Sequence, residues 1–426
     1  MASIHYRMQK ASDSMNKPLT GETAKTSQAG QTNQTSQAGQ TNQTSCSSLT
    51  DTRGKSAQRM ALLRAYMREH NLDGLLIRTT SNITWLSAFD DVFDDEQAHC
   101  ILLTQDGAVL HTDSRYYDAC VAAAQKGEAP LSVSMERAAH GRVAINVLKT
   151  QHASDDAFAL GIEDTMTLRE YQPLRNYAAF ELPRLTLHET SNVVLKARGV
   201  KDASEIARLQ AAQDVTDAGF SHIISWMKPG MTEREVQIEL EDYMIRHGAS
   251  GLAFRSIVAA GANAATAHAV PGETKLEAGQ CIVMDFGAAA YGYCSDMTRC
   301  VFLGEPSAKI KDAYTVLRRA NETVQARLHV GMTGKEAHEM AEQILAEGGY
   351  EGRMGHSLGH GVGIDIHEEP VLASRNDQPL VEGNVVTVEP GIYIPGEFGM
   401  RLEDCGVLTH EGYKVFGKST HEMVII

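Results

Sequence analysis

The sequence lacks the features of a membrane protein, a disulfide-rich protein or a nucleic-acid-binding protein. No stretch approaches the run of about eighteen apolar residues of a spanning helix, and the first ten residues, MASIHYRMQK, contain no apolar export signal. The seven cysteines are irregularly spaced and include no C-x-x-C pair, which argues against a disulfide framework or a thiolate zinc site. The net charge of −15, without a Lys/Arg block, disfavours binding to nucleic acid or to anionic lipid. We therefore expect a cytoplasmic protein with neither kind of partner.

Residues 1–54 are poor in apolar side chains. The same nine residues, TSQAGQTNQ, occur twice, starting at Thr26 and again at Thr35. A polar low-complexity segment buries too little apolar surface to offset the entropy of ordering its backbone. We expect these residues to form a disordered tail.

From Lys55 the sequence takes on the pattern of a folded α/β domain. Met60, Leu63 and Met67 recur at helical spacing. The segment CILLTQDGAVLHTD, residues 100–113, predicts two strands joined by an Asp-Gly turn. A chain of 426 residues, 42% apolar and 22% charged, is expected to form more than one core. We place one domain at residues 55–190 and a second at residues 191–426.

The second domain contains an internal repeat. GMTEREVQIELEDYMIRHG at residues 230–248 and GMTGKEAHEMAEQILAEGG at residues 331–349 share a Gly-Met-Thr start, a Thr-x-x-Glu capping box and a final glycine. Each predicted helix is followed by strand sequence. Two copies of such a unit are expected to face each other across a pseudo-two-fold axis, with a curved antiparallel sheet between them.

Two aspartates lie in the strand sequence after the first copy. Asp285 and Asp296 are both embedded in β-favouring residues, and their midpoint lies between Ala290 and Tyr291, beside Gly292. Positions equidistant from a turn pair directly in an antiparallel hairpin. A chain reversal at this midpoint therefore predicts that the two carboxylates are cross-strand neighbours on one face.

Two glutamates repeat this pattern near the C-terminus. Glu389 and Glu403 are symmetric about Gly396, which belongs to a Pro-Gly turn signal. Four carboxylates brought together would repel one another, and some would hold protons at neutral pH. Two divalent ions would remove this repulsion, and ions about 3.5–4 Å apart can share a bridging hydroxide.

A histidine-containing segment completes the candidate site. Residues 355–370 read GHSLGHGVGIDIHEEP, in which glycines alternate with histidines and acids. One loop histidine by itself is more often a surface or capping residue than a metal ligand. Beside two acidic hairpins, however, it offers the single imidazole that suits a mostly oxygen site for Mn²⁺, Co²⁺, Fe²⁺ or Zn²⁺.

These motifs resemble those of the pita-bread metallopeptidases, most closely the Xaa-Pro peptidases (aminopeptidase P and prolidase). The motifs that carry the resemblance are DFGA, SDMTR, GHGVGIDIHEEP, VEPGIY and RLEDCG. The segments LDGLLIRTTSNITWLSAF, TDSRYYDAC and LGIED are similar to the creatinase-type N-terminal domain of that family. The resemblance covers residues 55–426. It implies an α/β (α+β) chain in which a smaller creatinase-like domain precedes a pita-bread catalytic domain with a pseudo-two-fold curved antiparallel sheet.

The resemblance also implies a pair of divalent metal ions. Mn²⁺ is the expected metal, with Co²⁺, Zn²⁺ or Fe²⁺ as alternatives. One ion would be bound by Asp285, Asp296 and Glu403. The other would be bound by Asp296, His360, Glu389 and Glu403, so that Asp296 and Glu403 bridge the two ions.

Further residues receive catalytic roles from the same resemblance. His268, in GANAATAHAVPGETKL, and His367, in DIHEEP, would hold substrate and stabilise the tetrahedral intermediate. Arg401 would support the bridging carboxylates through a charge-assisted hydrogen bond. Glu389 is the candidate to carry the proton, and His356 is placed behind the metal ligands.

The expected activity is hydrolysis of the Xaa-Pro bond, at the N-terminus of a peptide or in a dipeptide, by a metal-bridging hydroxide. The expected partners are a peptide with proline at the second position and, by analogy, further copies of the chain in a homodimer or higher homo-oligomer. The alternatives are a methionine aminopeptidase-like enzyme, a lyase or creatinase-like enzyme of the same fold, and a non-catalytic binding module. Methionine aminopeptidases usually lack the front domain, and binding modules typically lose ligands, so the complete set favours the Xaa-Pro peptidases.

Overall fold

The computed structural model describes residues 49–94, 96–151 and 157–426. Of the predicted disordered tail, residues 1–48 lie outside this part of the chain. Among the described residues, no helix combines the length and the apolar character needed to cross a membrane.

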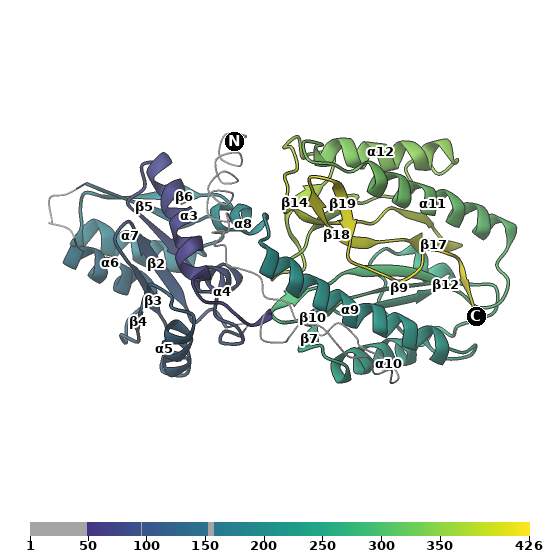
Figure 1. Cartoon of the computed structure of the whole chain (residues 1–426), viewed down its shortest axis with the longest axis horizontal. Helices are drawn as coiled ribbons and strands as arrows, with labels where there is room; N and C mark the ends of the chain where they lie inside the picture. The colour runs from purple at the N-terminus through teal and green to yellow at the C-terminus, as the bar shows by residue number, and fades with distance from the viewer. Residues whose placement is uncertain (1–48, 95, 152–156) are drawn as a thin grey trace, which may run out of the picture. The chain divides into compact units, whose positions relative to one another are not determined.

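The first folded region is an α/β unit with a six-stranded sheet (Figure 1). Helix α3 (Lys55–Glu69) buries Met60, Leu63 and Met67, as their spacing predicts. The predicted hairpin is formed by β2 (Cys100–Thr104) and β3 (Ala108–His111), which pair antiparallel. The sheet order is β4-β3-β2-β1-β5-β6. The other strands are β1 (Gly74–Ile77), β4 (Ser132–Ser134), β5 (Phe158–Glu163) and β6 (Leu185–Thr190), and the other helices are α4 (Thr80–Ser87), α5 (Tyr117–Lys126), α6 (His140–Gln151), α7 (Leu168–Glu181) and α8 (Val193–Arg198).

The region from residue 203 onward consists of two helix pairs, each followed by strands. The first half contains α9 (Ala203–Trp226), α10 (Glu233–Arg246), β7 (Gly251–Leu252), β8 (Ile257–Ala260), a 3₁₀ turn (Gly261–Ala265), β9 (Cys281–Phe286), β10 (Ala288–Ala290), β11 (Tyr293–Cys294) and β12 (Met297–Phe302). The second contains α11 (Ala308–Arg327), α12 (Gly334–Glu347), β13 (Gly359–Gly361), β14 (Glu368–Leu372), β15 (Val385–Val388), β16 (Gly391–Ile394), β17 (Phe398–Arg401), β18 (Asp404–Thr409), β19 (Gly412–Val415) and β20 (Val424–Ile425). The main sheets are β20-β12-β9-β8 and β14-β13-β15-β18-β19.

The internal repeat forms two equivalent helix starts. Thr232 accepts a hydrogen bond from the backbone nitrogen of Glu235 at the start of α10, over 3.1 Å. Thr333 accepts the equivalent bond from Glu336 at the start of α12, also over 3.1 Å. Figure 1 shows α9 and α10 along one side of the strands and α11 and α12 along the other. The predicted mixed α/β architecture, with strands between two copies of a helical unit, is confirmed.

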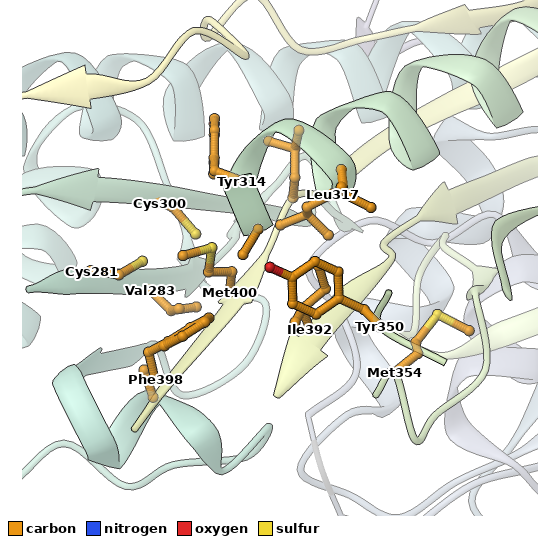
Figure 2. Packing of buried hydrophobic residues seen from close by; sticks show 14 of the residues in the cluster. Cys281, Val283, Cys300, Tyr314, Leu317, Tyr350, Met354, Ile392, Phe398 and Met400 are labelled. Atoms are coloured by element: carbon orange, nitrogen blue, oxygen red, sulfur yellow. The ribbon is translucent and has the colours of Figure 1, made fainter. Parts of the chain in front are cut away.

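One apolar cluster joins the strands of both halves to α11 and determines where the acidic side chains emerge. It includes Cys281, Val283, Cys300, Tyr314, Leu317, Ile392, Phe398 and Met400 (Figure 2). Side chains alternate along a strand, so the face of β9 that carries Val283 next carries Asp285. The buried apolar packing therefore aims the first carboxylate along the inner face of the sheet.

Gly359 allows two strands to approach closely beside His360. A Cβ at this position would lie 2.8 Å from the carbonyl carbon of Thr387 and nearer still to its oxygen. We expect Gly359→Ala to lower the free energy of unfolding by about 1–3 kcal/mol, because a backbone group cannot move aside as a side chain can. Gly251→Ala is the matched control, since a Cβ there meets nothing within 4 Å. Urea unfolding of both variants measures the difference, and equal midpoints would contradict the expectation.

Candidate metal centre

The first predicted hairpin is present, but its register differs from the prediction. Strands β9 and β12 pair antiparallel, and Asp285 lies opposite Thr298 rather than Asp296. The turn residues are Tyr291 and Gly292, whose φ angles are 53° and 74°, so the turn is centred one residue later than its symmetry predicted. The direct pairing of the two aspartates is therefore wrong by two residues. Because strand side chains have a period of two, both carboxylates remain on the same face.

The second hairpin has the predicted register. Strands β15 and β18 pair so that Val388 lies opposite Asp404. Strands β16 and β17 continue in the same register about Gly396. Glu389 and Glu403 lie between these two ladders, at facing positions. The turn symmetry seen in the sequence thus correctly predicts this carboxylate pair.

His360 presents one ring nitrogen to the acidic side chains. Its Nδ1 lies 3.0 Å from the carbonyl oxygen of Gly361, to which it donates a proton. Its Nε2 therefore carries a free lone pair, and it lies 3.5 Å from Asp296 Oδ2 and 3.4 Å from Glu389 Oε1. A backbone acceptor that selects the tautomer in this way is typical of metal-binding histidines.

Arg401 connects the two hairpins from behind the carboxylates. Its Nη2 forms an ion pair with Asp285 Oδ2. Its Nε donates to Thr298 Oγ1 over 3.1 Å, and Thr298 in turn donates to Glu403 Oε2 over 2.6 Å. The guanidinium is buried, and the surrounding acids keep its pKa well above the usual value. Arg401 thus contacts Asp285 directly and Glu403 through Thr298, and its supporting role stays a prediction.

The buried carboxyl groups of the site repel one another when they are ionised. Burial, together with the charges of Glu403 and Asp285, raises the pKa of Asp296 well above its usual value. Burial and the charge of Glu389 do the same for the pKa of Glu403. Burial also raises the pKa of Glu389. Without a cation, this site favours protonated acids at pH values where exposed carboxyls are ionised.

The donor groups fit divalent metal ions. One ligand atom from each of Asp296, His360 and Glu403 lies within 4.8 Å of the other two. Asp285 Oδ1 is buried without a hydrogen-bond partner among the described residues. A buried carboxylate oxygen without a donor is costly unless a cation faces it. Four carboxylates and one imidazole form the donor set that Mn²⁺, Co²⁺, Zn²⁺ or Fe²⁺ accepts.

The two histidines predicted to contact substrate lie beside this centre. The rings of His367 and His360 are 4.4 Å apart between centroids. Burial first, and then the neighbouring His360 and His268, lower the pKa of His367. His268 is exposed and follows Ala267, whose carbonyl oxygen accepts a hydrogen bond from Arg401 over 3.2 Å. Both histidines are exposed to solvent.

His356 and Tyr393 form a contact behind the ligands. Tyr393 Oη accepts a hydrogen bond from Arg401 Nη1 over 2.8 Å. His356 Nε2 lies 3.2 Å from the same hydroxyl group. Burial lowers the pKa of His356, so the ring is a neutral partner near neutral pH. This position agrees with the role assigned to His356 from the sequence.

Sequence reasoning missed the charged residues that hold the histidine segment in place. Glu368, directly after His367, forms buried ion pairs with Arg198 and with Lys201, whose Nζ lies 3.0 Å from Glu368 Oε2. Arg198 also donates to Asn82 Oδ1 over 2.7 Å. The acids of HEEP were visible in the sequence. Their partners were not, because neither cation lies in a recognisable motif.

Comparison with known proteins adds independent evidence. Residues 207–410 match the model described as metallopeptidase family M24, and residues 59–200 match the creatinase/prolidase N-terminal domain. The chain is 30% identical over 359 residues to an Xaa-Pro dipeptidase of Pyrococcus horikoshii, which covers 84% of this chain and 96% of that protein.

Solved structures give the same picture. An Xaa-Pro dipeptidase from Bacillus anthracis aligns with a TM-score of 0.79 and 35% identity, covering 87% of this chain and 100% of that one. An X-Pro aminopeptidase from Thermotoga maritima aligns with a TM-score of 0.73 and 30% identity, covering 85% of this chain and 100% of that one. The predicted pita-bread fold with a creatinase-type N-terminal domain is therefore confirmed.

Proposed function

The chain belongs to metallopeptidase family M24, and on this basis we propose that it hydrolyses the bond between the first residue of a peptide and a proline at the second position. Relatives named Xaa-Pro dipeptidase and X-Pro aminopeptidase support this specificity. The creatinase/prolidase match at residues 59–200 favours this branch over a methionine aminopeptidase-like enzyme. The structural observation that carries the proposal is the cluster of ligand atoms from Asp296, His360 and Glu403, with Glu389 Oε1 3.4 Å from His360 Nε2. Asp285 Oδ1 adds a buried oxygen that has no hydrogen-bond partner among the described residues.

The proposed metal ligands are the residues predicted from the sequence. Asp285, Asp296, His360, Glu389 and Glu403 would hold the ions, and Asp296 and Glu403 would be shared by both. The chemistry that a bound pair of divalent ions supplies is activation of water at neutral pH and polarisation of the scissile carbonyl. Mn²⁺ is our first choice of metal.

The chain's own groups orient the substrate and move the proton. His367 and His268 are exposed to solvent, and they would donate hydrogen bonds to the substrate carbonyl and to the developing oxyanion. Glu389 Oε1 accepts a hydrogen bond from Thr387 over 3.1 Å, which leaves Oε2 to take a proton and return it to the departing nitrogen.

Proline explains why a dedicated site is needed. The nitrogen of an Xaa-Pro bond carries no hydrogen and lies in a ring, so it cannot donate to a backbone acceptor as other peptide nitrogens do. The departing ring nitrogen must receive a proton as the C–N bond breaks. A proton on Glu389 beside a fixed scissile bond meets this requirement.

A peptide assay after metal exchange tests the proposed function. The protein is stripped with a chelator, dialysed and supplied with Mn²⁺, then given an Xaa-Pro dipeptide, a longer Xaa-Pro peptide and the longer peptide with alanine in place of proline. We expect hydrolysis of proline substrates only. Cleavage of the dipeptide alone indicates a prolidase, and cleavage of the longer peptide an aminopeptidase P. Cleavage of the alanine peptide, or failure to cleave any of the three substrates, would contradict the proposed specificity.

The metal-free protein should lose stability as pH rises. The folded state holds protons on Asp296 and Glu403 more tightly than the unfolded state does, because burial and repulsion raise the pKa of both. Their contribution is fully present below the unfolded pKa, about 4, and is lost as pH rises through the folded values. We expect the urea concentration at the unfolding midpoint of the chelated protein to decrease as the pH is raised from 5 to 8. Addition of Mn²⁺ should remove most of this decrease. The same dependence of the urea midpoint on pH with and without Mn²⁺ would contradict the assignment of Asp296 and Glu403 as metal ligands.

The remaining expectations concern assembly and compartment. We propose a homodimer or higher homo-oligomer, by analogy with the family, and light scattering after size-exclusion chromatography measures it. The six cysteines among the described residues are free and buried, which supports a reducing compartment such as the cytoplasm.

A further inference from the structure

The front domain contains a second cluster of metal-ligating side chains, distant in sequence from the acids described above. Cys100 is on β2, His111 on β3 and His140 at the first residue of α6. One ligand atom from each residue lies within 4.8 Å of the other two. Cys100 and His111 are direct partners in the antiparallel ladder, so the sheet itself holds them together.

Hydrogen bonding prepares His111 as a ligand. Its Nε2 lies 2.9 Å from the carbonyl oxygen of Glu136, and a carbonyl only accepts, so Nε2 carries the hydrogen. Its Nδ1 is therefore an acceptor, and it takes a hydrogen bond from His140 Nδ1 over 2.7 Å. A ring nitrogen that donates to a backbone carbonyl while the other points at a cluster of donors is the usual arrangement of a metal-binding histidine.

The surroundings of the cluster are apolar. Cys100 and His111 are 2% and 4% exposed. Cys100 packs with Leu102 of its own strand and with Leu148 of α6 in one buried cluster. Burial also keeps the His140 ring neutral, with its pKa lowered to about 3, and keeps the Cys100 sulfur protonated, with its pKa raised to about 12. A cation that binds here would displace the thiol proton, and the hydrogen of the neutral His140 ring would move from Nδ1 to Nε2 so that Nδ1 can bind.

The nearest positive charge does not prevent cation binding. Arg78 is close enough to affect both His140 and Cys100, but its guanidinium forms an ion pair with Glu170 over 2.5 Å. The net charge of this pair is zero. A divalent ion with one thiolate would leave a site of single positive charge, partly open to water because His140 is only half-buried.

We propose that Cys100 Sγ, His111 Nδ1 and His140 Nδ1 bind a single Zn²⁺ or similar borderline divalent ion in the front domain. Thiolate and imidazole are the donors that Zn²⁺ prefers in tetrahedral sites, with water as the fourth ligand. Two nitrogens on one tetrahedral Zn²⁺ are about 3.3 Å apart, so the His140 ring must withdraw by roughly half an ångström. Its place at a helix start, half-buried, allows this movement.

This site differs from the thiolate zinc sites that the sequence argues against. Those sites contain paired cysteines in C-x-x-C spacing. Here one cysteine combines with two histidines brought together by a hairpin and a helix start. The ion would join β2 and β3 to α6 and stabilise the front domain, independently of peptide hydrolysis.

Cobalt substitution of the full chain tests the proposal. The chelated protein is titrated with Co²⁺ and its near-ultraviolet and visible absorption is recorded. A thiolate bound to Co²⁺ gives an intense sulfur-to-cobalt charge-transfer band, whereas the carboxylate and imidazole ligands of the candidate metal centre contain no sulfur. We expect this band in the wild-type chain, its loss in Cys100→Ser, and its retention in Cys120→Ser, which alters another buried cysteine of the same domain.

Two further measurements make the result decisive. In His140→Ala, the Co²⁺ affinity measured by titrating the band should fall at least tenfold. Because His140 is half-buried, the variant should keep its fold, as measured by circular dichroism. Metal content of the Zn²⁺-loaded protein should fall by one equivalent in Cys100→Ser relative to Cys120→Ser. A wild-type protein without the band, or a band that survives in Cys100→Ser, would overturn the proposal and leave a neutral His-His hydrogen bond as the role of the cluster.

Discussion

Replacing Asp296 with asparagine is expected to abolish hydrolysis and, at the same time, to make the metal-free protein harder to unfold. Asparagine has nearly the same shape but carries no charge, so it would not supply the anionic ligand that we propose for the metal ions. We expect kcat/KM to fall by about a thousandfold or more, the scale seen when a preorganised charge is removed from an active site. Bound metal per chain should fall in parallel.

The expected gain in stability of the metal-free protein follows from the same carboxylate. The pKa of Asp296 is raised by burial and by the neighbouring acids, so the metal-free fold is destabilised by this group at neutral pH. Removing the charge removes that cost. We expect chelated Asp296→Asn to unfold at a higher urea concentration than chelated wild type at pH 8.

A variant on the turn of the second hairpin provides the control. Glu397 lies on the exposed turn between β16 and β17, where it pairs with Lys309 over 2.5 Å. Glu397→Gln should leave kcat/KM, metal content and the urea midpoint close to wild type. Loss of stability in Asp296→Asn, or activity above one tenth of wild type, would contradict the assignment of Asp296.

Replacing Arg198 with methionine is expected to produce the largest loss of stability. Its side chain is 2% exposed and forms an ion pair with Glu368, which is itself buried. Removing one member of a buried pair leaves an uncompensated charge and costs about 3–5 kcal/mol. Lys201 still contacts Glu368 over 3.0 Å, so we expect a value near the lower end of this range.

The loss at Arg198 should also affect catalysis through His367. Glu368 follows His367 directly, and Arg198 additionally donates to Asp365 Oδ2 over 2.8 Å in the same segment. Disorder in this segment should both raise KM and lower kcat, since His367 is proposed to hold the substrate and to stabilise the developing oxyanion. Urea unfolding and steady-state kinetics at low temperature, where the variant remains folded, measure the two effects.

An exposed ion pair serves as the control for Arg198. Lys309→Met removes a cation whose side chain is 55% exposed, and such pairs contribute about 0–1 kcal/mol. The double variant Arg198→Met/Glu368→Gln leaves the buried Lys201 without its carboxylate partner, so it should recover none of the lost stability. A single Arg198→Met variant as stable as Lys309→Met would contradict a stabilising role for the buried pair.

The sequence alone predicted most of what depends on local patterns. Capping boxes at Thr232 and Thr333 predicted two helix starts, and both form as predicted. Symmetry about Gly396 predicted the register that places Glu389 opposite Glu403. These features depend on a few neighbouring residues whose backbone preferences are strong, and a hairpin turn transmits its position to every pair in the ladder.

The error at the first hairpin has the same physical origin. Tyr291 adopts a positive φ of 53° beside Gly292, which moves the turn centre by one residue and the pairing by two. A sequence symmetric about two acids does not determine which residue takes the left-handed conformation. The face of the sheet was predicted correctly because a shift of two preserves it.

What the sequence determined by itself is the kind of chemistry: the acids, the imidazole, the duplicated helical unit and the hairpins that present them. Only the tertiary structure determined which charged residues form ion pairs with one another. Arg198 meets Glu368, and Arg401 meets Asp285, across separations in the chain that no local preference spans. Such contacts form because burial makes an unpaired charge or polar atom costly, and that cost exists only once distant segments have packed together.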